Sequence, residues 1–355
     1  MIFSYQCPKR SKQRQAIFNH HLTNEDDLIL QLIQYLDLNH SAQKKIQNIA
    51  QDLVTKVREL PHLATLDAFL KEYDLSTEEG ITIMCIAESI LRIPDADTGN
   101  ALIQDKLSSA NWSKHVGHSS SLFVNASTWA FLLSGKMLRV KRDENSELED
   151  TLSKIISQSS KPVIRQAVQQ AIKLISNHFI ISSNIQDSYK KSKEQNNAQY
   201  RYSFDMLGEA AITSEDADKY FEKYLDAIRH LKKLENNDPV LGPGVSIKLS
   251  ALHPRFECHK YESVFDRLYP RLKSLANEAM RANIGLVIDA EETDRLDIQL
   301  DLFKALCQEP NLHAWNGLGI AVQAYQKRAF YVIDWLIELA ESTKRRLMIR
   351  LVKGA

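Results

Sequence analysis

The amino-acid sequence predicts an α/β protein: an all-helical N-terminal region followed by the first half of a (βα)8 TIM-like barrel, with four of the eight strands present. Before about residue 180, apolar side chains recur at helical spacing, and capping signals precede several of these stretches. After it, four short apolar runs alternate with helical stretches at about 30 to 40 residues per unit. This alternation is typical of βαβ units in a parallel sheet.

The N-terminal region is expected to begin with two amphipathic helices. Thr23 and Asp26 resemble a capping box for a helix through Leu36, and a second helix is expected after Ser41. Its apolar stripe is predicted at Ile46, Ile49, Leu53 and Val57. Further helices are expected in GITIMCIAESILRI, in SLFVNASTWAFLLSGKML and after Pro162.

Composition suggests three domains. Residues 183–200 are polar and poor in apolar side chains, which predicts a domain boundary. We therefore expect a helical arm that can mediate dimerisation (1–60), a helical domain (61–182) and a partial barrel that ends after its fourth strand (183–355).

The four expected strands lie in VSIKLSAL from Val245, IGLVIDAEE from Ile284, LGIAVQAYQ from Leu318 and LMIRLVKGA from Leu347. Because successive strand side chains point to opposite faces, each strand has one apolar face. The other faces carry Ser246, Lys248 and Ser250; Val287, Asp289 and Glu291; Ala321, Gln323 and Tyr325; and Met348, Arg350, Val352 and Gly354. In a barrel these polar groups would converge at the mouth, where ligands bind.

Composition narrows the functional class. The chain has 355 residues with 45 Lys and Arg against 45 Asp and Glu, so no charge excess indicates nucleic-acid binding. No apolar segment has the length or flanks of a signal peptide or a membrane span. The four cysteines are far apart, which indicates a reducing compartment and no zinc site. A cytoplasmic location is expected.

Several chemistries remain open from the residues alone. The strands could form a half-solvated antiparallel sheet, although the intervening helical stretches favour a parallel one. Lys248 could be a Schiff-base lysine. Asp289 and Glu291 could bind a metal ion, but no histidine lies at a supporting spacing. His253 is interpreted as a hydrogen-bonding loop residue, and Tyr325 and Trp315 as packing residues. A mouth with two cations, two carboxylates and an amide suits a zwitterionic or phosphorylated ligand.

Long stretches of the sequence resemble one family. YRYSFDMLGEAAITSEDADKY, GPGVSIKLSALHPRFE, IDAEETDRLDIQLDLFKAL, WNGLGIAVQAYQKRA and RRLMIRLVKGA are similar to the proline dehydrogenase part of the bifunctional PutA family. NWSKHVGHSSSLFVNASTWAFLLSGKML resembles the helical region ahead of that part. Some members begin with a ribbon-helix-helix DNA-binding segment. No such pattern is seen before residue 40, so no DNA-binding segment is expected.

The resemblance implies a distorted (βα)8 barrel that holds FAD at the C-terminal ends of its strands. It implies oxidation of L-proline to 1-pyrroline-5-carboxylate, the first step of proline degradation to glutamate, with electrons passed to a membrane quinone. It also implies a homodimer and peripheral association with the inner membrane when the enzyme is reduced. NAD would serve only a C-terminal domain that is absent from this chain.

Family roles can be carried to the positions that match the motifs. Lys248 matches the lysine that pairs with the proline carboxylate, and Asp289 an acidic residue near the proline amine and the flavin. Ala355 matches a residue of the proline pocket. The flavin-binding positions are matched by Gln323, Arg350, Val352, Lys353 and Gly354. By strand alternation Lys353 points away from Arg350, so its role is implied by the resemblance alone.

Four strands make half a barrel, whereas the complete fold takes roughly 250 residues. The sequence therefore predicts a fragment of the family's barrel that alone does not oxidise proline. The alternatives are a helical interaction protein with a degenerate half barrel, or a Schiff-base aldolase that uses Lys248.

Overall fold

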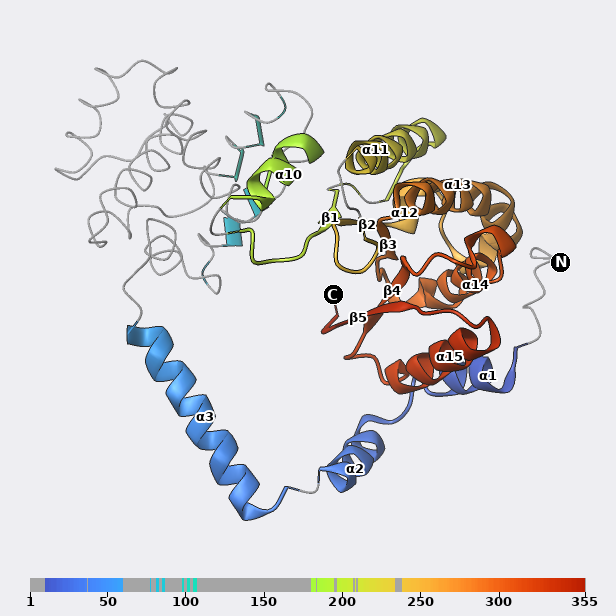
Figure 1. The fold of residues 1–355 in the computed structure, drawn as a ribbon. Coiled ribbons are helices and arrows are strands. Elements are labelled where there is room, and N and C mark those ends of the chain that lie inside the picture. Colours follow the sequence, from blue (N-terminus) through green and yellow to red (C-terminus); the bar gives the residue numbers. More distant parts are fainter. Residues whose placement is uncertain are drawn as a thin grey trace, which may run out of the picture. The chain divides into compact units, whose positions relative to one another are not determined.

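The computed structural model describes residues 10–36, 38–59, 180–182, 184–194, 197–206, 208, 210–233 and 238–354, with isolated positions between 77 and 106. The chain divides into two compact units, residues 1–37 with 184–355 and residues 38–183 (Figure 1). The helices expected between residues 76 and 180 lie almost wholly outside the described residues.

In the second unit the structure describes one long helix, α3 (His40–Glu59). Asn39 caps it, because its side-chain oxygen accepts a hydrogen bond of 2.9 Å from the Ala42 N–H. This helix was predicted after Ser41. Its expected apolar stripe is more than half exposed at Ile46, Ile49, Leu53 and Val57.

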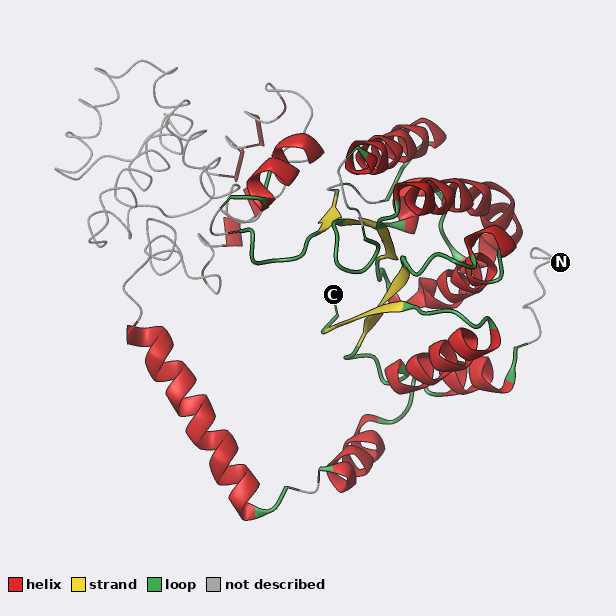
Figure 2. Cartoon of the chain, in the orientation of Figure 1, coloured by secondary structure: helices red, strands yellow, loops and turns green. Residues whose placement is uncertain are grey.

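The first unit is built on a five-stranded parallel sheet with strand order β1-β2-β3-β4-β5 (Figure 2). The strands are β1 (Ser203–Asp205), β2 (Gly244–Ile247), β3 (Gly285–Ile288), β4 (Leu318–Gln323) and β5 (Met348–Val352). The parallel sheet confirms the predicted pairing mode, and β2 to β5 are the four predicted strands. The predicted count of four was wrong, because the structure has a fifth strand, β1. This strand was missed because it has only three residues and Phe204 is its one apolar side chain.

Helices alternate with these strands as expected. They are α10 (Ile185–Ser192), α11 (Ser214–Lys232), α12 (Leu249–Leu252), α13 (Tyr261–Ala282), α14 (Leu296–Cys307) and α15 (Ala329–Ser342), with 3-10 turns at Cys258–Lys260, Thr293–Arg295 and Pro310–Leu312. Figure 1 shows α11 to α15 on the same side of the sheet. This sheet with its outer layer of helices is the arrangement of a (βα)8 barrel wall.

The core lies between the sheet and this helical layer. Val245, Ile247, Leu286, Ile288 and Ile320 of the strands are fully buried, and so are Ile228, Leu268, Leu272, Leu275, Leu302 and Phe303 of the helices. Burying such side chains contributes about 1.5 to 3 kcal/mol each relative to their exposure. The core therefore fixes the strands, and with them the side chains at their C-terminal ends.

Local signals explain where the main helices begin and end. Thr213 and Asp216 form a capping box at the start of α11, each side chain accepting from the other residue's backbone N–H. The left-handed Asn283, with φ of 51°, ends α13 directly before β3. At α2 (Glu25–Tyr35) the cap is Asn24, one residue after the predicted Thr23.

A short N-terminal helix, α1 (Lys12–Asn19), was not predicted and packs against α15. Its buried Arg14 donates to the Asp297 carbonyl oxygen at 2.8 Å and forms an ion pair with Asp301 at 3.1 Å. The same guanidinium lies over the Trp335 ring, 5.3 Å from its centroid. Residues 283 positions apart in the sequence thus join one helical layer.

Within the described part of the chain, every helix is too short or too polar to span a bilayer.

Candidate active site

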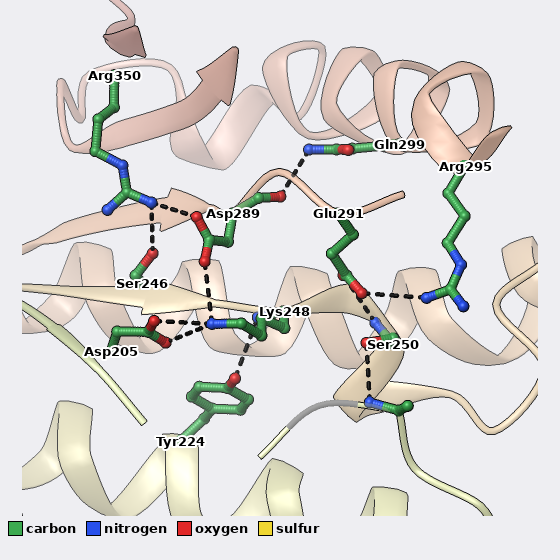
Figure 3. Close-up of polar contacts among 11 residues, drawn as sticks. Asp205, Tyr224, Ser246, Lys248, Ser250, Asp289, Glu291, Arg295, Gln299 and Arg350 are labelled. Atoms are coloured by element: carbon green, nitrogen blue, oxygen red, sulfur yellow. Dashed lines mark hydrogen bonds and ion pairs between the residues drawn. The ribbon is translucent and has the colours of Figure 1, made fainter. Parts of the chain in front are cut away.

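Four charged side chains of alternating sign lie in a row across the C-terminal ends of the strands (Figure 3). Lys248 Nζ is 2.8 Å from Asp205 Oδ2 and 3.0 Å from Asp289 Oδ2. The Arg350 guanidinium pairs with the other oxygen of Asp289. We call this row, Asp205–Lys248–Asp289–Arg350, the charge row. It joins β1, β2, β3 and β5.

Lys248 is fixed by its backbone as well as by its ion pairs. It directly follows β2 and is the N-cap of α12. Its N–H donates to the Tyr224 hydroxyl at 3.1 Å, and Tyr224 is fully buried in α11. Burial raises the pKa of the Tyr224 phenol, so this hydroxyl stays neutral. The lysine therefore leaves the strand at a defined position.

Two opposing effects set the charge of Lys248. Burial disfavours the ammonium form, but hydrogen bonds and charges from Asp205 and Asp289 outweigh burial and raise the pKa of Lys248. The lysine is therefore a cation at neutral pH, and its side chain is only 14% exposed.

Asp289 is the centre of the charge row, because each of its two carboxylate oxygens contacts one cation. It follows β3 directly, and its N–H donates to the Ile247 carbonyl of β2 at 2.9 Å. Its own carbonyl oxygen accepts from the buried Gln299 side chain of α14 at 2.9 Å. Sheet and helix together hold the backbone from which this carboxylate extends.

Arg350 reaches the row from the middle of β5. Its terminal nitrogen also lies 3.4 Å from the Ser246 hydroxyl of β2. Its Nε is buried and has no hydrogen-bond partner among the described residues. A buried donor without a partner is unfavourable by about 1 to 3 kcal/mol, so Arg350 retains capacity for another acceptor.

The other sequence-predicted residues of the last strands lie at the end of β4, at the end of β5 and directly after β5. Gln323 ends β4, is buried, and donates to the Glu291 carbonyl at 2.7 Å. Val352 is the last residue of β5, and Lys353 is exposed. Gly354 has a φ of 127°, and a Cβ there would meet the Tyr325 ring at 1.9 Å. Ala355 lies outside the described residues.

Ser250 was expected on the same strand face as Lys248, and this was wrong because α12 begins directly after Lys248. In the structure Ser250 is tied to the buried Glu291. Its N–H donates to the Glu291 carboxylate at 3.0 Å, and its hydroxyl accepts from the Ala210 N–H at 3.0 Å. Burial raises the pKa of Glu291, while the hydrogen bonds from Ser250 lower it. The hydrogen bond between the Ala210 N–H and the Ser250 hydroxyl anchors the loop after β1.

Comparison with known proteins supports the same conclusion as the motifs. Residues 188–355 match the family described as proline dehydrogenase, and residues 11–58 match the proline dehydrogenase N-terminal domain of proline utilization A. The bifunctional protein PutA of Klebsiella aerogenes is 44% identical over 99% of this chain, and that of Escherichia coli is 43% identical. The chain spans 27% of the length of these curated relatives.

Solved structures agree with this. A proline utilization A structure with proline bound in remote sites is 35% identical, with a TM-score of 0.64, over 99% of this chain and 34% of that one. A mutant of Bradyrhizobium japonicum proline utilization A is 36% identical, with a TM-score of 0.63, over 94% of this chain and 33% of that one.

The chain belongs to the PutA family of proline dehydrogenases. Its matches extend from near the N-terminus to residue 355 and correspond to the N-terminal region of PutA.

One match runs against an expectation. Residues 65–179 match a family described as the DNA-binding domain of proline dehydrogenase. The sequence was expected to contain no DNA-binding segment, on the ground that no ribbon-helix-helix pattern is seen before residue 40. The matched residues lie farther along the chain, in a region that the strand-helix-helix criterion did not address.

Two residues of the candidate site were missed by sequence reasoning. Asp205 lies at the end of the three-residue β1, and no apolar run marked that strand. Tyr224 lies on the buried face of α11, where the sequence pattern does not distinguish it from an ordinary core residue. Asp205 could have been found in the quoted motif that begins YRYSFDMLGE, where it directly follows Phe204.

Proposed function

We propose that this chain forms part of an FAD-dependent proline dehydrogenase that oxidises L-proline to 1-pyrroline-5-carboxylate. The charge row carries this proposal. Proline is a zwitterion, and the row offers cations and carboxylates in alternation at the C-terminal ends of parallel strands. Membership of the PutA family names the amino acid.

Each pole of proline has a partner in the row. Lys248, which is cationic at neutral pH, would bind the carboxylate in place of part of its contact with Asp205. Asp205 is 47% exposed, so the substrate can displace it more readily than it can displace Asp289, which is 17% exposed. Asp289 would bind the proline nitrogen. The residues thereby orient the substrate, and alignment of reactants is the main contribution a protein makes to such a reaction.

FAD fits the residues beside the row. The unpartnered Nε of Arg350 requires an acceptor, and polar heteroatoms of a flavin ring would supply one. Arg350, Lys353, Gln323, Asp289, Val352 and Gly354 are the residues proposed to hold it. When bound, FAD supplies the two-electron acceptor for proline oxidation. Arg350 and Lys353 would favour a negatively charged reduced ring by their positive charge.

The Schiff-base alternative is less well supported. A Schiff-base lysine must be neutral to attack a carbonyl, and such lysines have a lowered pKa. The two carboxylates at Lys248 instead raise its pKa. The alternative of a pure interaction protein does not account for a charge row built from four strands.

Further partners follow from the same family. We propose a membrane quinone as electron acceptor, a homodimer, and a cytoplasmic protein that associates with the inner membrane when reduced. NAD would belong to a further domain of PutA proteins outside this sequence.

The test uses the full-length protein, its flavin absorbance and its proline-dependent reduction of a soluble quinone. In Lys248→Met we expect bound flavin to remain and kcat/KM for proline to fall by about 10- to 100-fold, because one charged hydrogen bond is lost. Lys304→Met, on the exposed side of α14, is the matched control and should behave like the unmodified protein.

Three results would reject this function: absence of flavin in the unmodified protein, unchanged kcat/KM in Lys248→Met, or trapping of a carbonyl compound on Lys248 by borohydride.

A further inference from the structure

A second cluster of cations lies apart from the charge row. A cavity of about 410 Å³ is formed by the start of α11, the loop after α12 and the first half of α13. Its lining includes His253, Arg255, Lys260, Arg267 and Arg271. Figure 1 shows α11, α12 and α13 next to one another. We call this cavity the basic pocket; none of its residues takes part in the proposed proline chemistry.

The positive charge of the basic pocket is only partly neutralised. Arg271 pairs with Asp218, and the exposed Arg255 lies 3.9 Å from Glu257, at the limit of an ion pair. Lys260 and Arg267, both exposed, form no ion pair with any described residue. Two cations are therefore left to attract an anion.

His253 adds a neutral donor from the loop after α12. Only 6% of the residue's surface is exposed. Its Nδ1 accepts from the Arg255 N–H at 3.1 Å, so the neutral ring carries its proton on Nε2. Nε2 lacks a hydrogen-bond partner in the described structure. Burial, with the charges of Arg267 and Arg271, lowers the pKa of His253, so the ring donates as a neutral group.

The start of α11 contributes backbone donors. In an α-helix the first N–H groups have no acceptor within the helix. The capping box uses the N–H of Thr213 and of Asp216, which leaves those of Ser214 and Glu215. Ser214 lines the basic pocket, at the positive end of a 19-residue helix.

We propose that the basic pocket binds a phosphate group. A phosphate offers several acceptor oxygens to donors that converge from different directions, whereas a carboxylate offers two. Here a guanidinium, an ammonium, a neutral imidazole N–H and helix N–H groups come from three separate elements. The same chemistry is presented by free phosphate and by the head group of an anionic phospholipid.

The test is a calorimetric titration of the full-length protein with inorganic phosphate at constant ionic strength. Arg267→Gln and Lys260→Gln remove unpaired, exposed cations, so both variants should fold normally by circular dichroism. We expect saturable binding that weakens about tenfold with each substitution. Arg346→Gln, which removes another exposed arginine outside the basic pocket, is the matched control and should leave the affinity unchanged.

A second arm identifies the source of the phosphate. Vesicles of phosphatidylcholine with or without phosphatidylglycerol are floated with each variant. Retention that depends on Arg267 and Lys260 points to a lipid head group, and phosphate binding without such retention points to a free ligand; both results support the pocket. The proposal is overturned when neither probe binds, or when Arg267→Gln and Arg346→Gln weaken binding equally. Neither result depends on proline oxidation.

Discussion

At the scale of single residues, the proposed function depends on the protonation of the charge row. The pKa of Lys248 is raised, so its ion pairs are complete below its ordinary value of 10.5 and are lost only as the pH rises through the higher folded value. Between neutral pH and about pH 10 the lysine should therefore remain a cation, ready for a carboxylate.

Substituting Asp205 tests this assignment. Asp205→Asn removes one of the two carboxylates that raise the pKa of Lys248, so the pH at which the lysine loses its proton should fall. We expect KM for proline to begin rising at a lower pH than in the unmodified protein. The measurement is the pH profile of KM, with the exposed Asp226→Asn as control. Identical profiles for Asp205→Asn and the unmodified protein would contradict the prediction.

Glu291 gives a second residue-scale prediction, which concerns the pH dependence of stability. Its carboxyl pKa is raised, so the folded state holds that proton more tightly and loses stability as the pH rises above 4.5. Glu291→Gln keeps an acceptor for Ser250 and cannot titrate. Relative to the unmodified protein it should gain stability between pH 4.5 and pH 8.

Urea unfolding at both pH values measures this difference. Glu291→Ala is the companion variant: it leaves the Ser250 N–H without its partner and should lose about 1 to 3 kcal/mol. A stability difference between Glu291→Gln and the unmodified protein that does not change with pH would argue against a raised pKa.

At the scale of elements, β4 and β5 approach too closely for a side chain at Gly319. A Cβ there would lie 2.7 Å from the Met348 carbonyl oxygen and 2.9 Å from the Met348 Cβ. Because one of these atoms belongs to the backbone of β5, the strands would have to separate.

Gly319→Ala should therefore lower the free energy of unfolding by about 1 to 3 kcal/mol. It should also reduce bound flavin, because β5 carries Arg350. Urea midpoints and flavin absorbance check both effects, with Glu338→Ala on the exposed side of α15 as control. Retention of full stability in Gly319→Ala would contradict this prediction, because it would show that β5 can move away from β4 without lowering the free energy of unfolding.

The individual strands and helices also show which parts of the fold could be predicted from the sequence. The strands β2 to β5 were found because each is an apolar run between helical stretches. Strand β1 and helix α1 were missed, because three residues with one apolar side chain, and eight residues of which only Arg14 and Ile17 are buried, give little periodic signal. Strand alternation placed Lys248 at the mouth but failed at Ser250, because it assumed that the strand continued.

The shared sheet face of Lys248, Asp289, Gln323 and Arg350 followed from alternation, since side-chain direction in a strand is set by position. The ion pairs of Asp289 with Lys248 and Arg350 did not, because these depend on how neighbouring strands are aligned. Asp205 was missed for a different reason, because no apolar run marked the three-residue β1.

At the scale of the whole molecule, α1 closes the helical layer over α14 and α15. Arg14→Ala would leave Asp297 and Asp301 near each other with less positive charge, and would remove the contact with Trp335. Because the arginine is buried and the carboxylates are partly exposed, we expect a loss of about 1 to 3 kcal/mol.

Unfolding in urea, followed by Trp fluorescence, measures this loss. Arg10→Ala is the control, since the ion pair of Arg10 with Asp297 is longer at 3.4 Å, and its contact with the Phe18 ring is made to α1 itself. Equal losses in the two variants would mean that Arg14 has no special part in holding α1.

The contact between Arg14 and Asp297 also sets an order of events during synthesis. The ribosome makes α1 first, yet its partner residues appear 283 positions later. At about 5 to 20 residues per second this is a delay on the order of 15 to 60 s. Throughout that interval the helix has no surface on which to bury Ile17. Ile17 and Arg14 therefore reach their native packing only after α14 and α15 have been made.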